Sequence, residues 1–414
     1  MHMPIAASET FVTSEAHGTA LDVADRLGYR NDGTGTVVPL EVPGQITRLR
    51  VDVTKEVPTF FMRVFGMDSV TLSRDATAEY IKPLPLGSPE NQFGNDPGCA
   101  PNILTETDCA GFWGNIHGKY TNNGMGDAYS SYCDSNNGLG CPINPLWRED
   151  GYVFAIDVPV DTTLTIDIVD PAFVQGGGNS INAGDNPILG NPGPTTRFTL
   201  YERVDFLSQS FIGTPECQTD YPPEPVGTPF EWRHFCTVNV TAGTYPLRVE
   251  IEGEGFGLNR WSLRATSPTA QQPSIFAVGD MSIYANVIAG GSEFFLAEVT
   301  PANAGKTMEI DLFDPGEANG DNEIRIVDPD GNSPPCHLVI PSDGVDQDLA
   351  QCIIDTTRPA HNYHDDWLFV EIDLPSSYTC TDCWWKIVYD YEGNATDTTT
   401  WTARMRGNPI RLLP

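Results

Sequence analysis

An internal repeat constrains the fold of this chain more than any other feature of its sequence. Residues 151–171, GYVFAIDVPVDTTLTIDIVDP, match residues 293–315, EFFLAEVTPANAGKTMEIDLFDP: each gives a strand, a link with proline, a second strand and an Asp-Pro end. Each copy closes with a strand that carries Trp261 or Trp401. Alternating strands joined by turn-rich loops are typical of β-sandwiches. The repeat therefore predicts two tandem jelly-roll-like sandwiches, and places them at residues 151–268 and 269–414.

The ten cysteines fall as five close pairs in loops rich in Gly, Pro and Asn. Even, short spacings of this kind indicate local disulfides formed in an oxidising compartment. Metal binding or redox chemistry is the competing interpretation. A zinc site would need two C-x-x-C motifs, and only CTDC (380–383) has that spacing. A redox site would place the motif at the start of a helix, whereas CTDC continues directly into an alternating strand. The expected disulfides are Cys99–Cys109, Cys133–Cys141, Cys217–Cys236, Cys336–Cys352 and Cys380–Cys383.

The charge of the chain excludes one class of partner. With 56 acidic against 23 basic residues, the formal net charge is -33. Such a surface repels phosphate backbones, so we expect no nucleic-acid partner. The same acidity is compatible with a solvated, soluble surface or with divalent cations.

Residues 1–82 have a pattern unlike the rest of the chain. Apolar residues recur at helical spacing in residues 8–28, and two alternating strands follow. The stretch VPTFFMRVFGMDSVTLSRDATAEY, residues 57–80, predicts a short helix, a stop at Gly66 and another strand. The expectation is a small α+β head, then a linker and disulfide-loop segment over residues 83–150, in a mainly β chain.

The head carries a family resemblance. The segments ALDVADRLGYRNDGTGTVVPL (20–40) and VTKEVPTFFMRVFGMDSVTLSRDATAEY (53–80) resemble the TadE/TadG-like module of Tad/Flp pilus assembly. The segments GFWGNIHGKY and DTTTWTARMRGNPIRL are similar to the long extracellular extension of TadG-like proteins. In that family a transmembrane helix precedes the module. Since residues 1–7 are MHMPIAA, we expect the exported portion of a longer polypeptide or a late-started gene model.

The resemblance implies a non-enzymatic protein of the bacterial cell surface that acts in pilus assembly or adhesion. Its implied partners are other pilus or cell-envelope proteins, and its implied membrane link is the N-terminal helix alone. The alternative is a secreted carbohydrate- or calcium-binding β-sandwich module whose partners are surface glycans.

Enzyme signatures are weak in the residues themselves. The sequence has no G-x-S-x-G, H-E-x-x-H or Walker motif. The run HNYHDDW (361–367) offers His361, His364, Asp365 and Asp366 for a metal or for acid–base work. Two histidines without a third placed ligand favour the other interpretation, a polar loop that enters the strand WLFVEIDL. We therefore expect no enzyme activity.

One acidic loop is a candidate calcium site. In DLFDPGEANGDNE the glycines permit tight wrapping and the side chains offer hard oxygen ligands. The spacing is not that of an EF-hand, and an ordinary acidic turn is the other interpretation. Calcium is the only cofactor that the sequence suggests. Its expected ligands are Asp311, Asp314, Glu317, Asn319 and Asp321.

Trp384 and Trp385 are adjacent on an expected strand. Neighbouring side chains of a strand point to opposite faces, so one indole should face the core and the other solvent. An outward tryptophan would mark a face that contacts glycans or proteins.

Overall fold

The computed structural model divides into two compact units, residues 1–82 with 407–414 and residues 83–406. The residues that the structure describes are 17–18, 20–42, 45–80, 82–98, 110–131, 144–175, 194–204, 213–225, 228–316, 320–357, 363–406 and 410–413.

The smaller unit is an antiparallel sheet with one helical segment. Helical residues within 17–26 end before Gly28, whose φ of 84° is the left-handed conformation that glycine adopts readily. The strand order is β1 (Gly35–Val42), β2 (Gln45–Pro58), β3 (Ser69–Tyr80) and β27 (Ile410–Leu413). The end of the chain thus pairs with β3 in this unit, whereas the sequence assigned it to the second sandwich.

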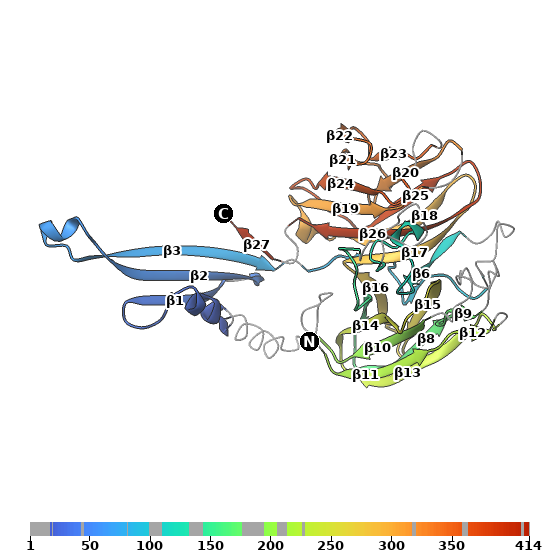
Figure 1. The fold of residues 1–414 in the computed structure, drawn as a ribbon, viewed down its shortest axis with the longest axis horizontal. Coiled ribbons are helices and arrows are strands. Elements are labelled where there is room, and N and C mark those ends of the chain that lie inside the picture. Colours follow the sequence, from blue (N-terminus) through green and yellow to red (C-terminus); the bar gives the residue numbers. More distant parts are fainter. Residues whose placement is uncertain are drawn as a thin grey trace. The chain divides into compact units, whose positions relative to one another are not determined.

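Strands β2 and β3 form a long hairpin that continues beyond β1 (Figure 1). The first residue of β1, Gly35, pairs with Lys55, whereas the hairpin pairing runs on to Pro58 and Ser69. The expected two-turn helix is wrong. It is a single 3-10 turn, η1 (Met62–Phe65), which ends at left-handed Gly66. This turn has no buried residue, so no packing stabilises a longer helix there.

The larger unit contains two antiparallel sheets. One is ten-stranded, with the order β11-β10-β14-β7-β16-β4-β18-β25-β20-β23. Its strands are Pro215–Tyr221, Thr195–Tyr201, Gly243–Glu252, Tyr152–Val158, Ser274–Val278, Pro85–Leu86, Ser292–Glu298, Trp384–Asp390, Glu323–Val327 and Ile353–Asp355.

The other sheet is eleven-stranded, with the order β13-β8-β15-β6-β17-β26-β19-β24-β21-β22 and β5 (Gln92–Phe93) beside β15. The strands of the main path are Trp232–Val240, Thr162–Val169, Leu258–Thr266, Gly111–His117, Asp280–Val287, Ala395–Met405, Thr307–Phe313, Trp367–Asp373, Cys336–Ile340 and Val345–Leu349. A small pair, β9 (Val174–Gln175) with β12 (Glu224–Pro225), lies outside both sheets.

Both large sheets cross the expected boundary at residues 268 and 269. In the ten-stranded sheet β16 pairs with β7, and in the eleven-stranded sheet β6 joins β15 to β17. The segment 83–150, expected as linker and disulfide loops, supplies β4, β5 and β6 to these sheets. The strand orders outward from the centre, β7-β14-β10 and β18-β25-β20, agree with those that a repeat would produce. The repeat itself remains an inference from the sequence.

Aromatic side chains from both sheets fill the space between them. In one half Trp261 of β15 lies against Phe154 of β7, with ring centroids 5.0 Å apart. In the other half Trp401 of β26 lies 6.0 Å from Phe294 of β18. Both tryptophans are 0% exposed, as expected for core anchors. Gly114 of β6 is required here, because a Cβ at that position would lie 2.5 Å from the ring of Trp261.

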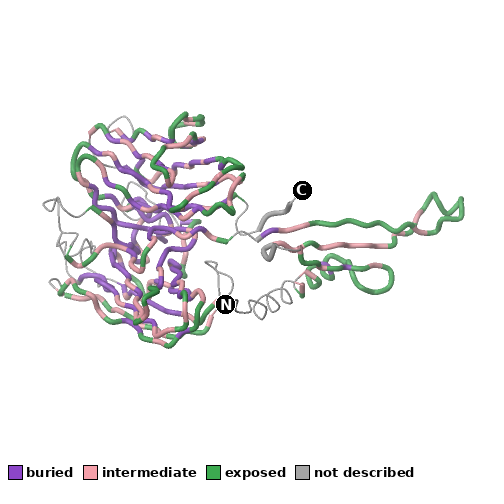
Figure 2. The backbone as a smooth tube through the Cα atoms, turned by 180° about the vertical axis from the view of Figure 1, so that it is seen from behind, coloured by how far each residue is buried: buried purple, intermediate pink, exposed green. Residues whose placement is uncertain are grey.

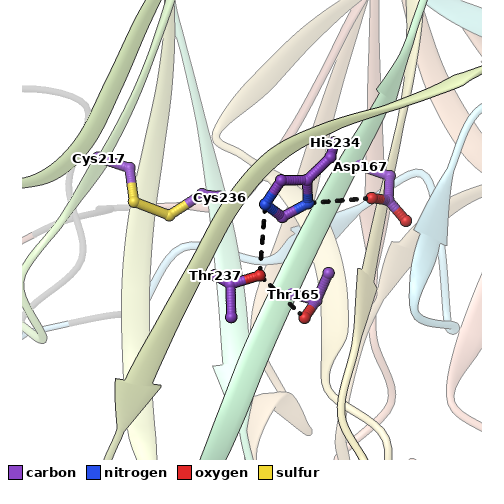
Figure 3. Close-up of a disulfide and its surroundings, with 6 residues drawn as sticks. All are labelled: Thr165, Asp167, Cys217, His234, Cys236 and Thr237. Carbon is purple, nitrogen blue, oxygen red and sulfur yellow. Dashed lines mark hydrogen bonds and ion pairs between the residues drawn. A yellow bond between two sulfur atoms is a disulfide. The ribbon is translucent and has the colours of Figure 1, made fainter.

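Disulfides join the two sheets at both outer ends. Cys217 of edge strand β11 bonds Cys236 of edge strand β13 (Figure 3). At the other end Cys336 of β21 bonds Cys352, the residue before edge strand β23. The third disulfide, Cys380–Cys383, precedes β25. These three expected pairs are confirmed. Cys99, Cys109, Cys133 and Cys141 lie outside the described residues.

Within the described residues, no helix has the length and apolar character needed to cross a membrane.

Candidate functional site

The most exposed apolar side chains among the described residues lie at the end of the β2–β3 hairpin. We call residues 59–68 the apolar tip. Phe60, Phe61, Val64 and Phe65 are 83%, 80%, 84% and 76% exposed, and the tip is correspondingly drawn as exposed in Figure 2. Such a continuous apolar patch on a folded surface indicates an interaction site.

The backbone of the apolar tip is held by hydrogen bonds within the tip itself. The amide of Thr59 donates to the carbonyl of Asp68 over 2.9 Å, which closes the base. The amides of Gly66 and Met67 donate to the carbonyls of Arg63 and Met62 over 3.0 and 3.1 Å. The turn is therefore a defined structure that holds its apolar side chains outward.

A second candidate is a cleft of about 590 Å³ in the larger unit, which we call the polar cleft. Its floor contains His117 at the end of β6, and Asp127 and Ser130 after the turn η2 (Asn123–Met125). The turn is anchored on β26, because the amide of Ala128 donates to the Thr400 hydroxyl over 3.0 Å. Together β6 and β26 position the polar residues of the floor.

These floor residues form two buried hydrogen-bonded pairs. Nδ1 of His117 lies 2.6 Å from the Ser130 hydroxyl. The Tyr152 hydroxyl donates to Asp127 Oδ1, and the amide of Tyr129 donates to the same atom over 3.0 Å. Above them Arg148 pairs with Asp280 and lies 3.6 Å from the ring centroid of Tyr129.

Burial shifts the titration of these groups in opposite directions. Burial raises the pKa of Asp127 to about 6, because desolvation disfavours the carboxylate. Burial, with a contribution from Arg260, lowers the pKa of His117 to about 3, so this imidazole is neutral near pH 7. Burial likewise raises the pKa of Tyr152 well above its ordinary value.

The rim decides what the polar cleft offers to a ligand. His117 and Ser130 are only 5% and 4% exposed, so an entering group meets the rim first. The rim includes Glu250, Glu252 and Glu254 from β14 and the turn after it. Lys119 also lines the cleft, and Glu252 pairs with Arg197, so the mouth carries charges of both signs.

The expected calcium loop is engaged within the protein where the structure describes it. Asp311 pairs with Arg404 over 2.6 Å, and Asp321 is exposed. Glu317 and Asn319 lie outside the described residues. Among the described residues no group of three or more His, Cys, Asp or Glu side chains is placed to hold a metal. Calcium binding stays a prediction, and titration calorimetry that shows no heat at millimolar Ca²⁺ would retire it.

The structure joins this loop to the second sequence candidate, HNYHDDW. The amide of Asp365 donates to Asp314 Oδ1 over 2.7 Å, and Nδ1 of His364 lies 3.4 Å from the same oxygen. Asp314 has a φ of 56°, and its equivalent in the first copy, Asp170, has a φ of 50°. His361 lies outside the described residues. The arrangement is that of a polar connection between two loops.

The prediction that one of the two adjacent tryptophans faces solvent is wrong, because both are buried. Trp384 and Trp385 are 8% and 2% exposed. Trp384 is covered because its ring packs edge-on against Phe295, with centroids 5.6 Å apart. The indole of Trp385 donates to the Tyr378 hydroxyl over 3.0 Å, and it lines a second cleft of about 600 Å³ with Pro334, Pro335, His337, Glu371 and Asp373.

Other aromatic residues take the outward positions that sequence reasoning missed. Trp367 and Phe369 of β24 are half-buried, and their ring planes are 15° apart with centroids at 6.0 Å. At the other end of the same sheet Trp232 is half-buried and stacks with Arg264 at 4.2 Å. The alternation in WLFVEID was the available signal for Trp367 and Phe369, because it places both on one face.

Beside the disulfide of Figure 3, a polar row crosses β8 and β13. Nδ1 of His234 lies 3.6 Å from Asp167, and its Nε2 lies 3.4 Å from the Thr237 hydroxyl. Thr165 and Thr237 face each other across the strands at 3.3 Å. His234 is exposed, so this row is a solvated cross-strand ladder.

Two solved structures can be aligned with this chain over most of their length, but with very low sequence identity and TM-score. One is the N-terminal CBM22-1-CBM22-2 tandem domain from Paenibacillus barcinonensis Xyn10C, at 9% identity over 92% of this chain and 91% of that one, with a TM-score of 0.15. The other is a three-domain portion of Extended-Synaptotagmin 2, its SMP domain with two C2 domains, at 8% identity over 97% and 100%, with a TM-score of 0.10. TM-scores this low establish no common fold.

No curated protein matches the sequence. A family model does: residues 4–78 match Tad_C, described as "Putative Tad-like Flp pilus-assembly". The match covers the helical segment, β1, β2, the apolar tip and most of β3. Over residues 4–78 this chain is therefore similar to the Tad-like Flp pilus-assembly family.

Proposed function

We propose that the chain is the extracellular portion of a pilus-associated protein of the bacterial surface, which acts without enzymatic activity in pilus assembly or adhesion. The observation that supports this is the way the two units are connected. The chain leaves the pilus-assembly module after β3, forms the whole of the larger unit, and returns to pair β27 with β3. The larger unit is thus inserted in the sequence between β3 and β27, two neighbouring strands of the smaller unit.

The chemistry of the larger unit supports a location outside the cytoplasm. The three disulfides among its described residues are of a kind that persists in oxidising compartments. Two of them fasten the outer ends of the large sheets, which suits a domain that is displayed and exposed to mechanical load. Its partners in this proposal are other pilus and envelope proteins.

Surface display tests the proposal directly. The full chain, produced from its own gene in cells with a complete Tad apparatus, should be cleaved by protease added to intact cells. Cells that lack the export ATPase of that apparatus should protect it. A cytoplasmic protein, inaccessible in both strains, would contradict the proposal, and so would an unchanged number of pili and unchanged adhesion after deletion of the gene.

A second candidate function, carbohydrate binding, is favoured by one observation. The nearly parallel rings of Trp367 and Phe369 lie on an outer strand face, where aromatic rings can stack on sugars. A glycan array should then show binding that Trp367→Ala removes and that Trp232→Ala, at the other end of the sheet, leaves unchanged. No binding by the unaltered chain, or equal loss in both variants, would end this candidate.

A further inference from the structure

The apolar tip has a composition that water does not favour. Six large apolar side chains follow within eight residues, and each is exposed: Phe60, Phe61, Met62, Val64, Phe65 and Met67. In the larger unit the exposed large apolar side chains are only Met125 and Leu146 among the described residues. This concentration calls for an occupant that removes the tip from water.

The shape of the tip restricts the occupant. It is the convex end of a two-stranded ribbon, formed by consecutive residues, and β1 stops short of it. A protein partner would need an apolar hollow that encloses the tip. Neither of the two clefts described above in a second copy suits the tip, because the polar cleft is lined by Glu250 and Glu252 and the second cleft by Glu371 and Asp373.

Part of the backbone of the tip is already hydrogen-bonded within the tip. Polar backbone groups enter hydrocarbon at low cost only when they are hydrogen-bonded within the segment. Here the amides of Thr59, Val64, Gly66 and Met67 all donate to carbonyls of residues 59–68. The Thr59 hydroxyl, too, donates to the carbonyl of Met67.

The charges of the tip and of the whole chain favour apolar insertion over electrostatic adsorption to a membrane. The two charged side chains of the tip, Arg63 and Asp68, are opposite in sign, and they lie 3.9 Å apart. The chain as a whole carries a charge of -33, which opposes adsorption to an anionic surface. The tip therefore has no net charge with which to select anionic lipids.

We propose that residues 59–68 insert into the apolar interior of a lipid bilayer and anchor the hairpin to a membrane through phenylalanine, valine and methionine side chains. The occupant is the acyl region of neutral lipid. This contact is additional to any anchor outside the sequence, and it does not depend on the proposed pilus role.

Vesicle flotation tests the insertion. The full chain is mixed with vesicles of phosphatidylcholine alone and with vesicles containing 30% phosphatidylglycerol, a composition of about one anionic lipid in three. We expect flotation with phosphatidylcholine at low and high salt, and weaker flotation with the anionic vesicles at low salt, because the chain carries a charge of -33. The double variant Phe61→Asp/Phe65→Asp should lower the partition coefficient at least tenfold. Leu146→Asp, a single change from an apolar to a charged side chain at an exposed site of the larger unit, should leave the partition coefficient unchanged.

Three results would overturn the proposal. The first is no flotation with phosphatidylcholine. The second is flotation that requires phosphatidylglycerol and disappears at high salt, which would show electrostatic adsorption. The third is self-association of the unaltered chain in sedimentation that Phe61→Asp/Phe65→Asp abolishes without vesicle binding, which would assign the tip to a second copy. Both side chains are about 80% exposed, so circular dichroism should show both variants folded.

Discussion

The two units of this chain are both built from β-strands, but they differ in where their large apolar side chains lie. The larger unit turns its large side chains inward between two sheets, and Trp261 and Trp401 are fully buried. The smaller unit has β-strands too, yet it holds fourteen of the sixteen exposed large apolar side chains among the described residues. Because apolar burial is the main stabilising term in folding, we expect the larger unit to gain more stability from its side chains. The exposed apolar side chains of the smaller unit remain available to contact a lipid or protein surface.

We expect the largest change in stability from substitutions in the core of the larger unit. Trp261→Ala and Trp401→Ala each remove a fully buried indole, and each should lower the free energy of unfolding by about 3–5 kcal/mol. Chemical denaturation of the larger unit's transition measures this. The sequence repeat aligns the two tryptophans, but Trp401 also donates to the Tyr389 hydroxyl over 3.2 Å, so we expect the larger loss at Trp401. A loss below about 1 kcal/mol at either site would show that its core can close over the gap.

Disulfide removal comes next and compares two loops of different length. Cys336 and Cys352 are 16 residues apart, and Cys380 and Cys383 are 3 apart. Loop-closure entropy predicts that the double change to Ser costs roughly 3 kcal/mol for the first pair and roughly 2 for the second. The first pair also joins the two sheets. A larger loss for the second pair in denaturant titration would contradict the structural role given to the sheet ends.

The polar cleft predicts a pH-dependent effect. The pKa of Asp127 is about 6 against an ordinary value of 3.8, so the folded state holds a proton there between these pH values that the unfolded chain has lost. Folding stability from this group therefore falls as pH rises through that window. Asp127→Asn should be neutral below pH 3.8 and should gain up to about 3 kcal/mol above pH 6.

His117 supplies the opposite slope as a control. Its pKa is lowered from 6.5 to about 3, so its contribution to stability is lost as pH falls through that range. The stability of His117→Gln relative to the unaltered chain should thus rise as pH falls. Parallel profiles for Asp127→Asn and His117→Gln would contradict the buried environment assigned to the floor of the polar cleft.

The smallest effect belongs to the apolar tip. Phe61→Ala changes a side chain that is 80% exposed, so the free energy of unfolding should change by less than about 0.5 kcal/mol. Thermal unfolding of the full chain measures it beside Trp401→Ala. A loss comparable to that of the tryptophan variant would show that the tip is packed in solution, and the contrast between the units would fail.

The sequence was informative wherever local pattern decides structure. Alternation located the strands around Trp261 and Trp401, and close spacing identified Cys217–Cys236, Cys336–Cys352 and Cys380–Cys383. The residues of the tip predicted a helix, because Phe, Met and Val at short spacings do not reveal whether anything will bury them. Only the absence of a packing surface made that segment a hairpin turn.

Features that depend on distant pairing could not be read in advance. The pairing of β27 with β3, which joins residues more than 300 apart, has no local signal. The same holds for β6 between the two halves of the eleven-stranded sheet, and for the cover that Phe295 places over Trp384. The polar cleft was missed because His117, Asp127 and Tyr152 converge from separate segments without a spacing motif.

Hydrogen exchange of the full chain, with and without phosphatidylcholine vesicles, tests the division between contact and stability most directly. If the apolar tip inserts into the bilayer, we expect slower exchange on vesicles in peptides that cover residues 57–70. Exchange in the strands that carry Trp261 and Trp401 should be unchanged. Slower exchange in those strands with an unchanged tip would contradict this division.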